Sequence, residues 1–302
     1  MKPGGMITLA AVTALAVLSI LGGCKAEPKA EISPARLVCI EMMQQVPVYY
    51  EDFEFWDVGI LREDPDLGEM YQIWYERKIE FLEERYGVRS TSIDYLAQGE
   101  GLLNIIKTDY DVGALRYRIS VDFYRDASYK DMEVWKSKPS RDPQSITGGW
   151  VLAEGLLVRG ANNSNVDDYL LVATGEELSM HDRNAAELLE RLPEGVMTRI
   201  SRSPVPTPQG SIISGMSVSK EEESTLRWSN VYKFESPEAA GQALTNEYFK
   251  KTEEDFKKAQ DELAKRGEPS PFRSFAIRQN GEFIEWSILI EEKYMIALLF
   301  YG

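Results

Sequence analysis

Residues 275–290, FAIRQNGEFIEWSILI, carry the clearest structural pattern in the chain. Apolar and polar residues alternate on both sides of Asn280-Gly281, and this alternation is the period of a β-strand with two different faces. Asn-Gly suits a two-residue hairpin turn because both of its positions tolerate a positive φ. The segment therefore predicts two antiparallel strands joined by a tight turn.

Similar patterns extend from this hairpin through the second half of the chain, residues 147–302. We expect strands at 150–158, 196–201, 211–218 and 225–234, and helices at 166–173, 185–192 and 237–266. The nearly all-apolar segment 294–301 predicts a last strand inside the sheet, because central strands are apolar on both faces. The second half is thus expected to be a mixed α+β unit that ends in a β-meander.

The first half, residues 34–138, predicts the element order β-α-β-β-α-β. The order follows from a buried strand at 53–58, a helix from Asp64-Pro65-Asp66 to Gly87, a hairpin around 99–101, a helix capped by Asp109 or Asp111, and a strand at 129–136. This is the ferredoxin-like order, in which helices pack on one face of an antiparallel sheet. The polar segment 139–149 is the predicted boundary between the halves.

The N-terminus predicts export from the cytoplasm. Lys2 precedes an uncharged run, 6–21, that ends in Leu21-Gly22-Gly23-Cys24. The run has the length of a signal-peptide core and is shorter than the roughly 20 apolar residues that a membrane span needs. Small residues at 22 and 23 let a protease reach the backbone, and the thiol of Cys24 is a nucleophile for lipid attachment.

This ending resembles the lipobox of bacterial lipoproteins. The resemblance implies a signal peptide at 1–23, cleavage between Gly23 and Cys24, lipidation of Cys24, and a polar tether at 24–33. It implies a membrane-anchored protein on the extracytoplasmic face of the bacterial cell envelope. A plain secretory signal and an uncleaved anchor are the alternatives. Residues 46–136, with FEFWDV at 53–58 and DPDL at 64–67, also resemble a group of uncharacterised bacterial lipoproteins, which implies no activity.

The composition disfavours several classes of function. The chain has 34 Lys and Arg against 49 Asp and Glu, a formal charge of −15, so we expect no nucleic-acid partner. One His and two Cys cannot form a multi-histidine metal centre or a disulfide scaffold, and we expect no metal and no cofactor. The acidic body favours a protein partner with a basic surface or a small cationic ligand.

Few residues stand out as candidates for chemistry. His181 lies in a polar stretch before a predicted helix, where capping or a surface position explains it. Asp64, Asp66 and Glu69 come closest to a cluster of oxygen ligands, but helix capping explains them as well. Cys39 lies among apolar residues, which predicts a buried and inert thiol. The six Trp residues all fall in predicted strands or helices, and we expect them in the core.

These patterns favour a non-catalytic binding or accessory module over an enzyme, and they assign no catalytic or ligand-binding residue. The first alternative is a carboxylate-based envelope hydrolase that acts on glycan. The second is a structural subunit of an envelope complex, in which another protein covers an apolar face.

Overall fold

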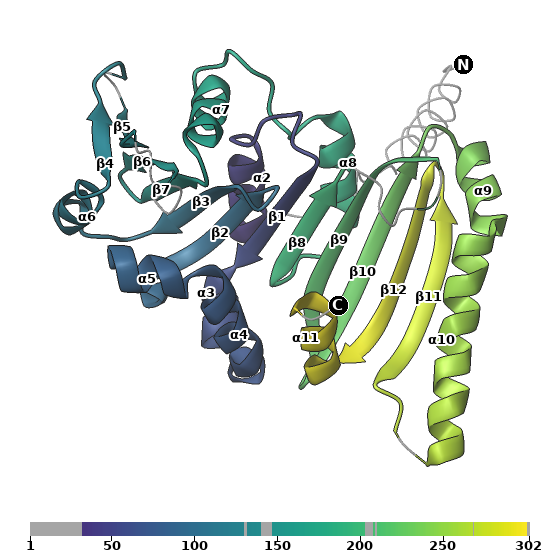
Figure 1. Cartoon of the computed structure of the whole chain (residues 1–302). Coiled ribbons are helices and arrows are strands. Elements are labelled where there is room, and N and C mark those ends of the chain that lie inside the picture. The colour runs from purple at the N-terminus through teal and green to yellow at the C-terminus, as the bar shows by residue number, and fades with distance from the viewer. Residues whose placement is uncertain are drawn as a thin grey trace, which may run out of the picture. The chain divides into compact units, whose positions relative to one another are not determined.

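The computed structural model describes residues 32–129, 132–139, 147–202, 208, 210–267 and 269–300 (Figure 1). The predicted signal peptide, Cys24, most of the tether and most of the boundary segment 139–149 lie outside the described residues. Contacts divide the chain into the units Met1–Pro34 and Ala35–Gly302. The fold below is that of the second unit.

The unit is a mixed α+β structure built on one large antiparallel sheet, as the sequence predicts at this level. Among the described residues the sheet has twelve strands. They are β1 (Asp52–Asp57), β2 (Ile93–Gly99), β3 (Leu103–Thr108), β4 (Phe123–Asp126), β5 (Glu133–Ser137), β6 (Gly149–Ala153), β7 (Leu156–Gly160), β8 (Met197–Ser201), β9 (Ser211–Glu222), β10 (Thr225–Phe234), β11 (Phe272–Asn280) and β12 (Phe283–Glu291).

Ten α-helices accompany the sheet within the described part of the chain. They are α2 (Pro34–Met43), α3 (Val58–Glu63), α4 (Gly68–Lys78), α5 (Glu80–Tyr86), α6 (Val112–Ile119), α7 (Asn163–Ala173), α8 (Arg183–Arg191), α9 (Pro237–Thr245), α10 (Glu247–Arg266) and α11 (Glu292–Phe300). The predicted hairpin at 275–290 is confirmed as β11 and β12, which pair across Asn280 and Phe283.

Groups of strands from the two predicted halves are interleaved along the sheet. The order is β11-β12-β10-β9-β8-β1-β2-β3-β7-β6-β5-β4. β1 pairs with β8 from the second half, and β3 pairs with β7 from the second half. Both open edges of the β1-β2-β3 group are therefore filled by strands that lie beyond residue 147.

The ferredoxin-like arrangement of the first half is not confirmed. β1, β2 and β3 are consecutive neighbours that pair antiparallel, whereas the ferredoxin-like arrangement is a split βαβ, with another strand between two parallel ones. The order of helices and strands along the chain is close to the predicted one. The pairing differs because β8 pairs with the free edge of β1 and β7 pairs with the free edge of β3. In the predicted arrangement these edges would pair with strands of the first half.

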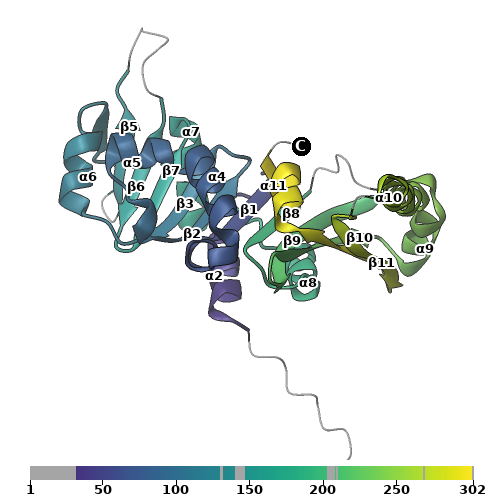
Figure 2. The same ribbon diagram turned by 90° about the horizontal axis from the view of Figure 1, so that it is seen from below.

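Helices cover both faces of the sheet, so the expectation of a single covered face is wrong (Figure 2). Phe53 and Phe55 pack in a cluster with residues of α2, α7 and α8, on what we call the α2 face. Trp56, on the opposite side of β1, packs with residues of α3, α4, α5, α6 and α11, on the α4 face. Because β1 carries large aromatic side chains on both sides, it can bury them under two helical layers.

The chain's predicted last strand is instead a helix, α11. It buries Met295, Ile296 and Phe300 and exposes part of Tyr294 and Leu298. A short apolar run has no periodicity that separates a buried strand from a buried helix. The second half therefore ends in a helix on the α4 face and not in a β-meander.

A polar network fixes the junction between α4 and α5, which become separate helices at Ile79. Lys78 Nζ lies 2.9 Å from Glu54 Oε1 on β1 and 2.6 Å from Gln98 Oε1 on β2. Gln98 in turn donates to Asn104 Oδ1 at 2.6 Å. These bonds hold the start of α5 against the sheet, and the other end of α5 forms one wall of the pocket described next.

Candidate functional site

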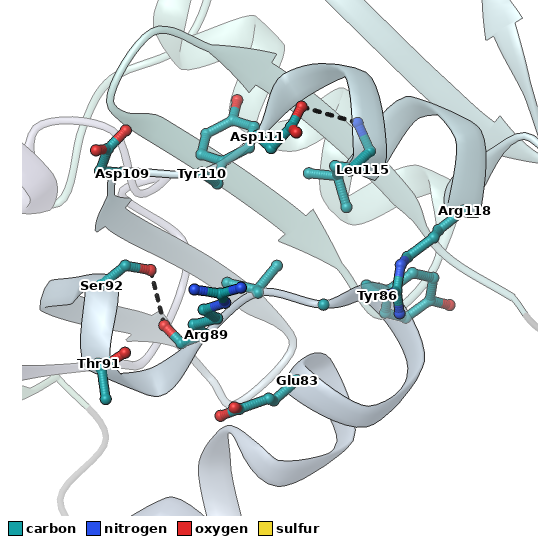
Figure 3. A pocket seen from close by; sticks show the side chains of 13 residues that line it. Glu83, Tyr86, Arg89, Thr91, Ser92, Asp109, Tyr110, Asp111, Leu115 and Arg118 are labelled. Atoms are coloured by element: carbon teal, nitrogen blue, oxygen red, sulfur yellow. Dashed lines mark hydrogen bonds between the residues drawn. The ribbon is translucent and has the colours of Figure 1, made fainter.

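A pocket of about 750 Å³ lies between the end of α5, the segment that follows it and the start of α6 (Figure 3). Its charged lining comes from four places along the chain. Glu83 belongs to α5, Arg89 to the following segment, and Arg118 to α6, while Asp109 and Asp111 precede α6. The pocket has the size expected of a site for a small molecule.

Gly87 shapes the wall between α5 and β2. It ends α5 in the left-handed conformation at φ 72°, and its N–H donates to the Glu83 carbonyl at 2.9 Å. Glycine adopts this conformation without the clash that a Cβ brings. A Cβ at this position would also lie 3.0 Å from Cζ of Arg118. The missing side chain therefore lets the Arg118 guanidinium lie close against the backbone.

The start of α6 forms the opposite wall. Asp111 caps the helix by accepting a hydrogen bond from the Ala114 N–H at 2.9 Å. Leu115 is buried and packs α6 onto the α4 face. Beside the cap, the Tyr110 hydroxyl donates to the Ala153 carbonyl at 2.8 Å, and burial raises the pKa of Tyr110. Tyr110 thus stays a neutral, anchored side chain at physiological pH.

The pocket's carboxylates and guanidiniums differ in how they are used. Glu83 Oε2 accepts the Ser90 N–H at 3.0 Å, and Asp111 is occupied by the cap. The guanidinium groups of Arg89 and Arg118 make no hydrogen bond or ion pair within the described residues. In Figure 3, Arg89 projects into the middle of the pocket and Arg118 descends from α6 beside Tyr86. The free ionic groups of the pocket are therefore these two guanidiniums and the carboxylate of Asp109, for which the described part of the chain offers no partner either.

A second pocket, of about 740 Å³, lies on the sheet beside the end of α8. Its guanidiniums, unlike those of Arg89 and Arg118, are bound to carboxylates. Arg191 and Arg278 both bind the Glu285 carboxylate, at 3.1 and 2.6 Å. Arg227 donates to Glu221 at 2.8 Å. Because its guanidiniums are already engaged, we take the pocket between α5 and α6 as the candidate site.

Asp64, a candidate oxygen ligand in the sequence, and Asp182, the neighbour of the candidate His181, are both helix caps. Asp64 accepts the Asp66 N–H at 3.0 Å and begins the short helix η1 (Pro65–Leu67), as predicted. Asp182, the neighbour of His181, caps α8 through the Ala185 N–H at 3.0 Å. Within the described ranges, no group of three or more His, Cys, Asp or Glu side chains could hold a metal ion.

The predicted core residues are placed as expected. Cys39 is buried, and burial raises the pKa of its thiol to about 12. The six Trp residues all belong to or pack against the cluster on the α4 face, three fully buried and three partly: Trp56, Trp74, Trp150, Trp135, Trp228 and Trp286. None of these residues is among those that line the pocket between α5 and α6.

Neither Arg89 nor Arg118 is recognisable as a site residue from the sequence. They are far apart along the chain, and no spacing links a loop arginine to one near the end of a later helix. The one local signal is the stretch Arg89-Ser90-Thr91-Ser92, in which a cation and three hydroxyls follow the helix stop at Gly87. Only the packing of α6 beside α5 brings the two guanidiniums to one pocket.

Among the helices in the described part of the chain, none has both the length and the apolar character needed to cross a bilayer. No protein-family model, no curated protein and no solved structure matches the sequence.

Proposed function

We propose that this chain is a lipid-anchored binding protein on the extracytoplasmic face of a bacterial cell envelope, and that the pocket between α5 and α6 binds a small ligand through an anionic group. The anchor rests on Leu21-Gly22-Gly23-Cys24 and the uncharged run before it. Two acyl chains on Cys24 would hold the protein on a membrane, where one chain is marginal.

The pair Arg89 and Arg118 carries the binding proposal. A guanidinium is planar and presents five N–H donors, which match the oxygens of a carboxylate or phosphate. Bonds between ionised partners are stronger than bonds between neutral ones. Both guanidiniums line the same pocket and have no partner among the described residues, so an anionic group can bind without displacing an existing ion pair.

The local charges point to a different ligand from the one that the net charge favours. The chain as a whole is acidic and favours cationic partners. Exposed charges that lie farther apart than about 10 Å are largely screened at physiological ionic strength, so the groups inside the pocket decide what binds there. The two free guanidiniums can thus bind an anionic group although the protein as a whole is acidic.

Binding can be tested by thermal shift and calorimetry with acetate, succinate and inorganic phosphate, each compared with chloride at equal ionic strength. We expect at least one of the three to raise the unfolding midpoint of the full chain. Arg89→Gln combined with Arg118→Gln should abolish the shift. Arg266→Gln, which removes an exposed guanidinium at the end of α10, is the matched control and should keep it. If all three anions match chloride, the binding proposal is wrong.

The anchor has its own test. In a bacterial host, mass spectrometry of the N-terminal peptide should find residues 1–23 removed and acyl chains on Cys24. Cys24→Ser should release the protein from the membrane fraction. A wild-type protein without acyl mass, together with a Cys24→Ser protein that stays on the membrane, would overturn the anchor and leave the binding proposal untouched.

A further inference from the structure

A smaller pocket of about 430 Å³ adjoins the candidate site. It lies between the start of α6, β5 and the β6–β7 turn, and it shares Asp109 and Tyr110 with the first pocket. Tyr110 is held in place by its hydrogen bond to the Ala153 carbonyl, and Ala153 lines the smaller pocket. The two pockets are therefore neighbours on either side of one fixed aromatic side chain.

In the smaller pocket, the one arginine is paired with a glutamate, and the other carboxylates there have no ionic partner among the described residues. Arg116 and Glu133 both line it, and the guanidinium binds the carboxylate through two nitrogens, one of them 2.7 Å from Glu133 Oε1. This pairing lowers the pKa of Glu133 and raises the pKa of Arg116. The carboxylates of Asp109 and Glu154 have no hydrogen bond or ion pair in the described part of the chain.

The charges that remain free are thus separated in space. Arg89 and Arg118 lie in the larger pocket, Glu154 lies in the smaller one, and Asp109 lines both. In the view of Figure 3, Asp109 and Arg118 lie at opposite sides of the larger pocket. A ligand with charge of one sign would satisfy only half of this arrangement. A ligand with an anionic end and a cationic end would satisfy both parts.

We infer that the ligand is a short peptide with both termini free, its carboxylate bound by Arg89 and Arg118 and its ammonium by Asp109 and Glu154. This inference rests on the proposed binding function and names the ligand class of that site. A free amino acid fits less well because both of its charges sit on one carbon, whereas the two pockets lie on either side of Tyr110. The Tyr110 ring supplies a surface for the backbone between the two ends.

The test compares three peptides by calorimetry with the full chain: tri-alanine, N-acetyl-tri-alanine and tri-alanine amide. The capped forms each remove one charge and keep the rest of the molecule. We expect tri-alanine to bind about tenfold or more tightly than either capped form, the difference of one charge-assisted contact. Asp109→Asn with Glu154→Gln should lower the affinity for tri-alanine to that for the N-acetyl form. The same pair of changes should leave the affinity for the N-acetyl form unchanged.

Glu254→Gln with Asp255→Asn, on the exposed side of α10, is the matched control for charge and should change none of the three affinities. Equal binding of tri-alanine and its N-acetyl form would overturn the peptide inference and leave the anion site standing. No binding of any peptide would also overturn it, with the acetate, succinate and phosphate series deciding the proposed function separately. If tri-alanine and its amide bind equally, and Arg89→Gln with Arg118→Gln has no effect on either affinity, both the peptide inference and the proposed anion site are wrong.

Discussion

Lys220 Nζ lies 2.7 Å from each carboxylate oxygen of Asp64, in a contact between residues 156 positions apart in the sequence. The same ammonium lies 2.7 Å from Asp66 Oδ2. Asp64 begins η1 ahead of α4, and Lys220 belongs to β9. The pairing lowers the pKa of Asp64 and raises the pKa of Lys220. An acidic helix start from the first half is thereby tied to a strand of the second.

Lys220→Met should lower the unfolding midpoint at pH 7 by roughly 1–3 °C, since exposed ion pairs contribute little individually. The lowered pKa of Asp64 gives stability that is lost as the pH falls through that pKa. The raised pKa of Lys220 gives stability that is lost as the pH rises through it. The difference between wild type and variant should therefore be largest between about pH 4 and pH 10. Lys257→Met, which breaks an exposed pair with Glu253 on α10, should change the midpoint less.

Ionised Glu292 should destabilise the fold at pH 7, whereas the ion pair of Lys220 with Asp64 stabilises it. Its pKa is raised, first by burial and then by the carboxylates of Glu69, Asp66 and Asp64. A carboxyl with a raised pKa in the folded state destabilises the fold once it ionises, so its contribution improves as the pH falls through that pKa. We expect Glu292→Gln to raise the unfolding midpoint at pH 7 and to match wild type near pH 3. Glu254→Gln, at an exposed position on α10, should change neither value; a lower midpoint for Glu292→Gln at pH 7 would contradict the prediction.

Local sequence patterns predict the positions of helices and strands better than they predict which strands pair in the sheet. Asn280-Gly281 marks a hairpin because Gly281 adopts the positive φ, 62°, that the tight turn after Asn280 needs. Asp64 marks a helix start because its oxygen reaches a free N–H. Which strand fills the open edge of β3 depends on a segment some 50 residues later, and no local pattern encodes that choice. The candidate site depends on the same kind of distant packing, since Arg89 and Arg118 meet only after α6 docks beside α5.

The C-terminal helix was predicted as a strand, and a packing variant tests its place in the core. Phe300 is nearly buried and stacks on Trp56, with 5.9 Å between the ring centroids. Phe300→Ala should destabilise the protein by about 3 kcal/mol in urea unfolding, the lower end for a buried phenylalanine, because it leaves a cavity beside Trp56. Leu298→Ala, on the exposed side of α11, should cost well under 1 kcal/mol. Equal effects of the two variants would mean that α11 does not pack as described.

Cys39 should behave as an inert thiol while the protein is folded. With a pKa of about 12, only about one thiol in 10⁴ is ionised at pH 8, whereas an ordinary cysteine is about a quarter ionised. In the Cys24→Ser protein, Ellman's reagent at pH 8 should therefore find no reactive thiol under native conditions and one per chain in guanidinium chloride. A fast reaction of Cys39 with the reagent in the folded protein would show that α2 separates readily from the sheet.

Gly87→Ala separates the two roles of this glycine at the candidate site. A Cβ at φ 72° strains the backbone, and it also meets Arg118 Cζ at 3.0 Å, so the guanidinium must move. Gly175→Ala is the matched control, since Gly175 has φ 77° but open space around its missing Cβ. Both variants should lose about 1–2 kcal/mol of stability through the left-handed conformation. Only Gly87→Ala should also weaken binding of the anion that stabilises wild type, because a displaced Arg118 no longer faces the ligand. Equal anion binding by the two variants would show that Arg118 is not part of the site.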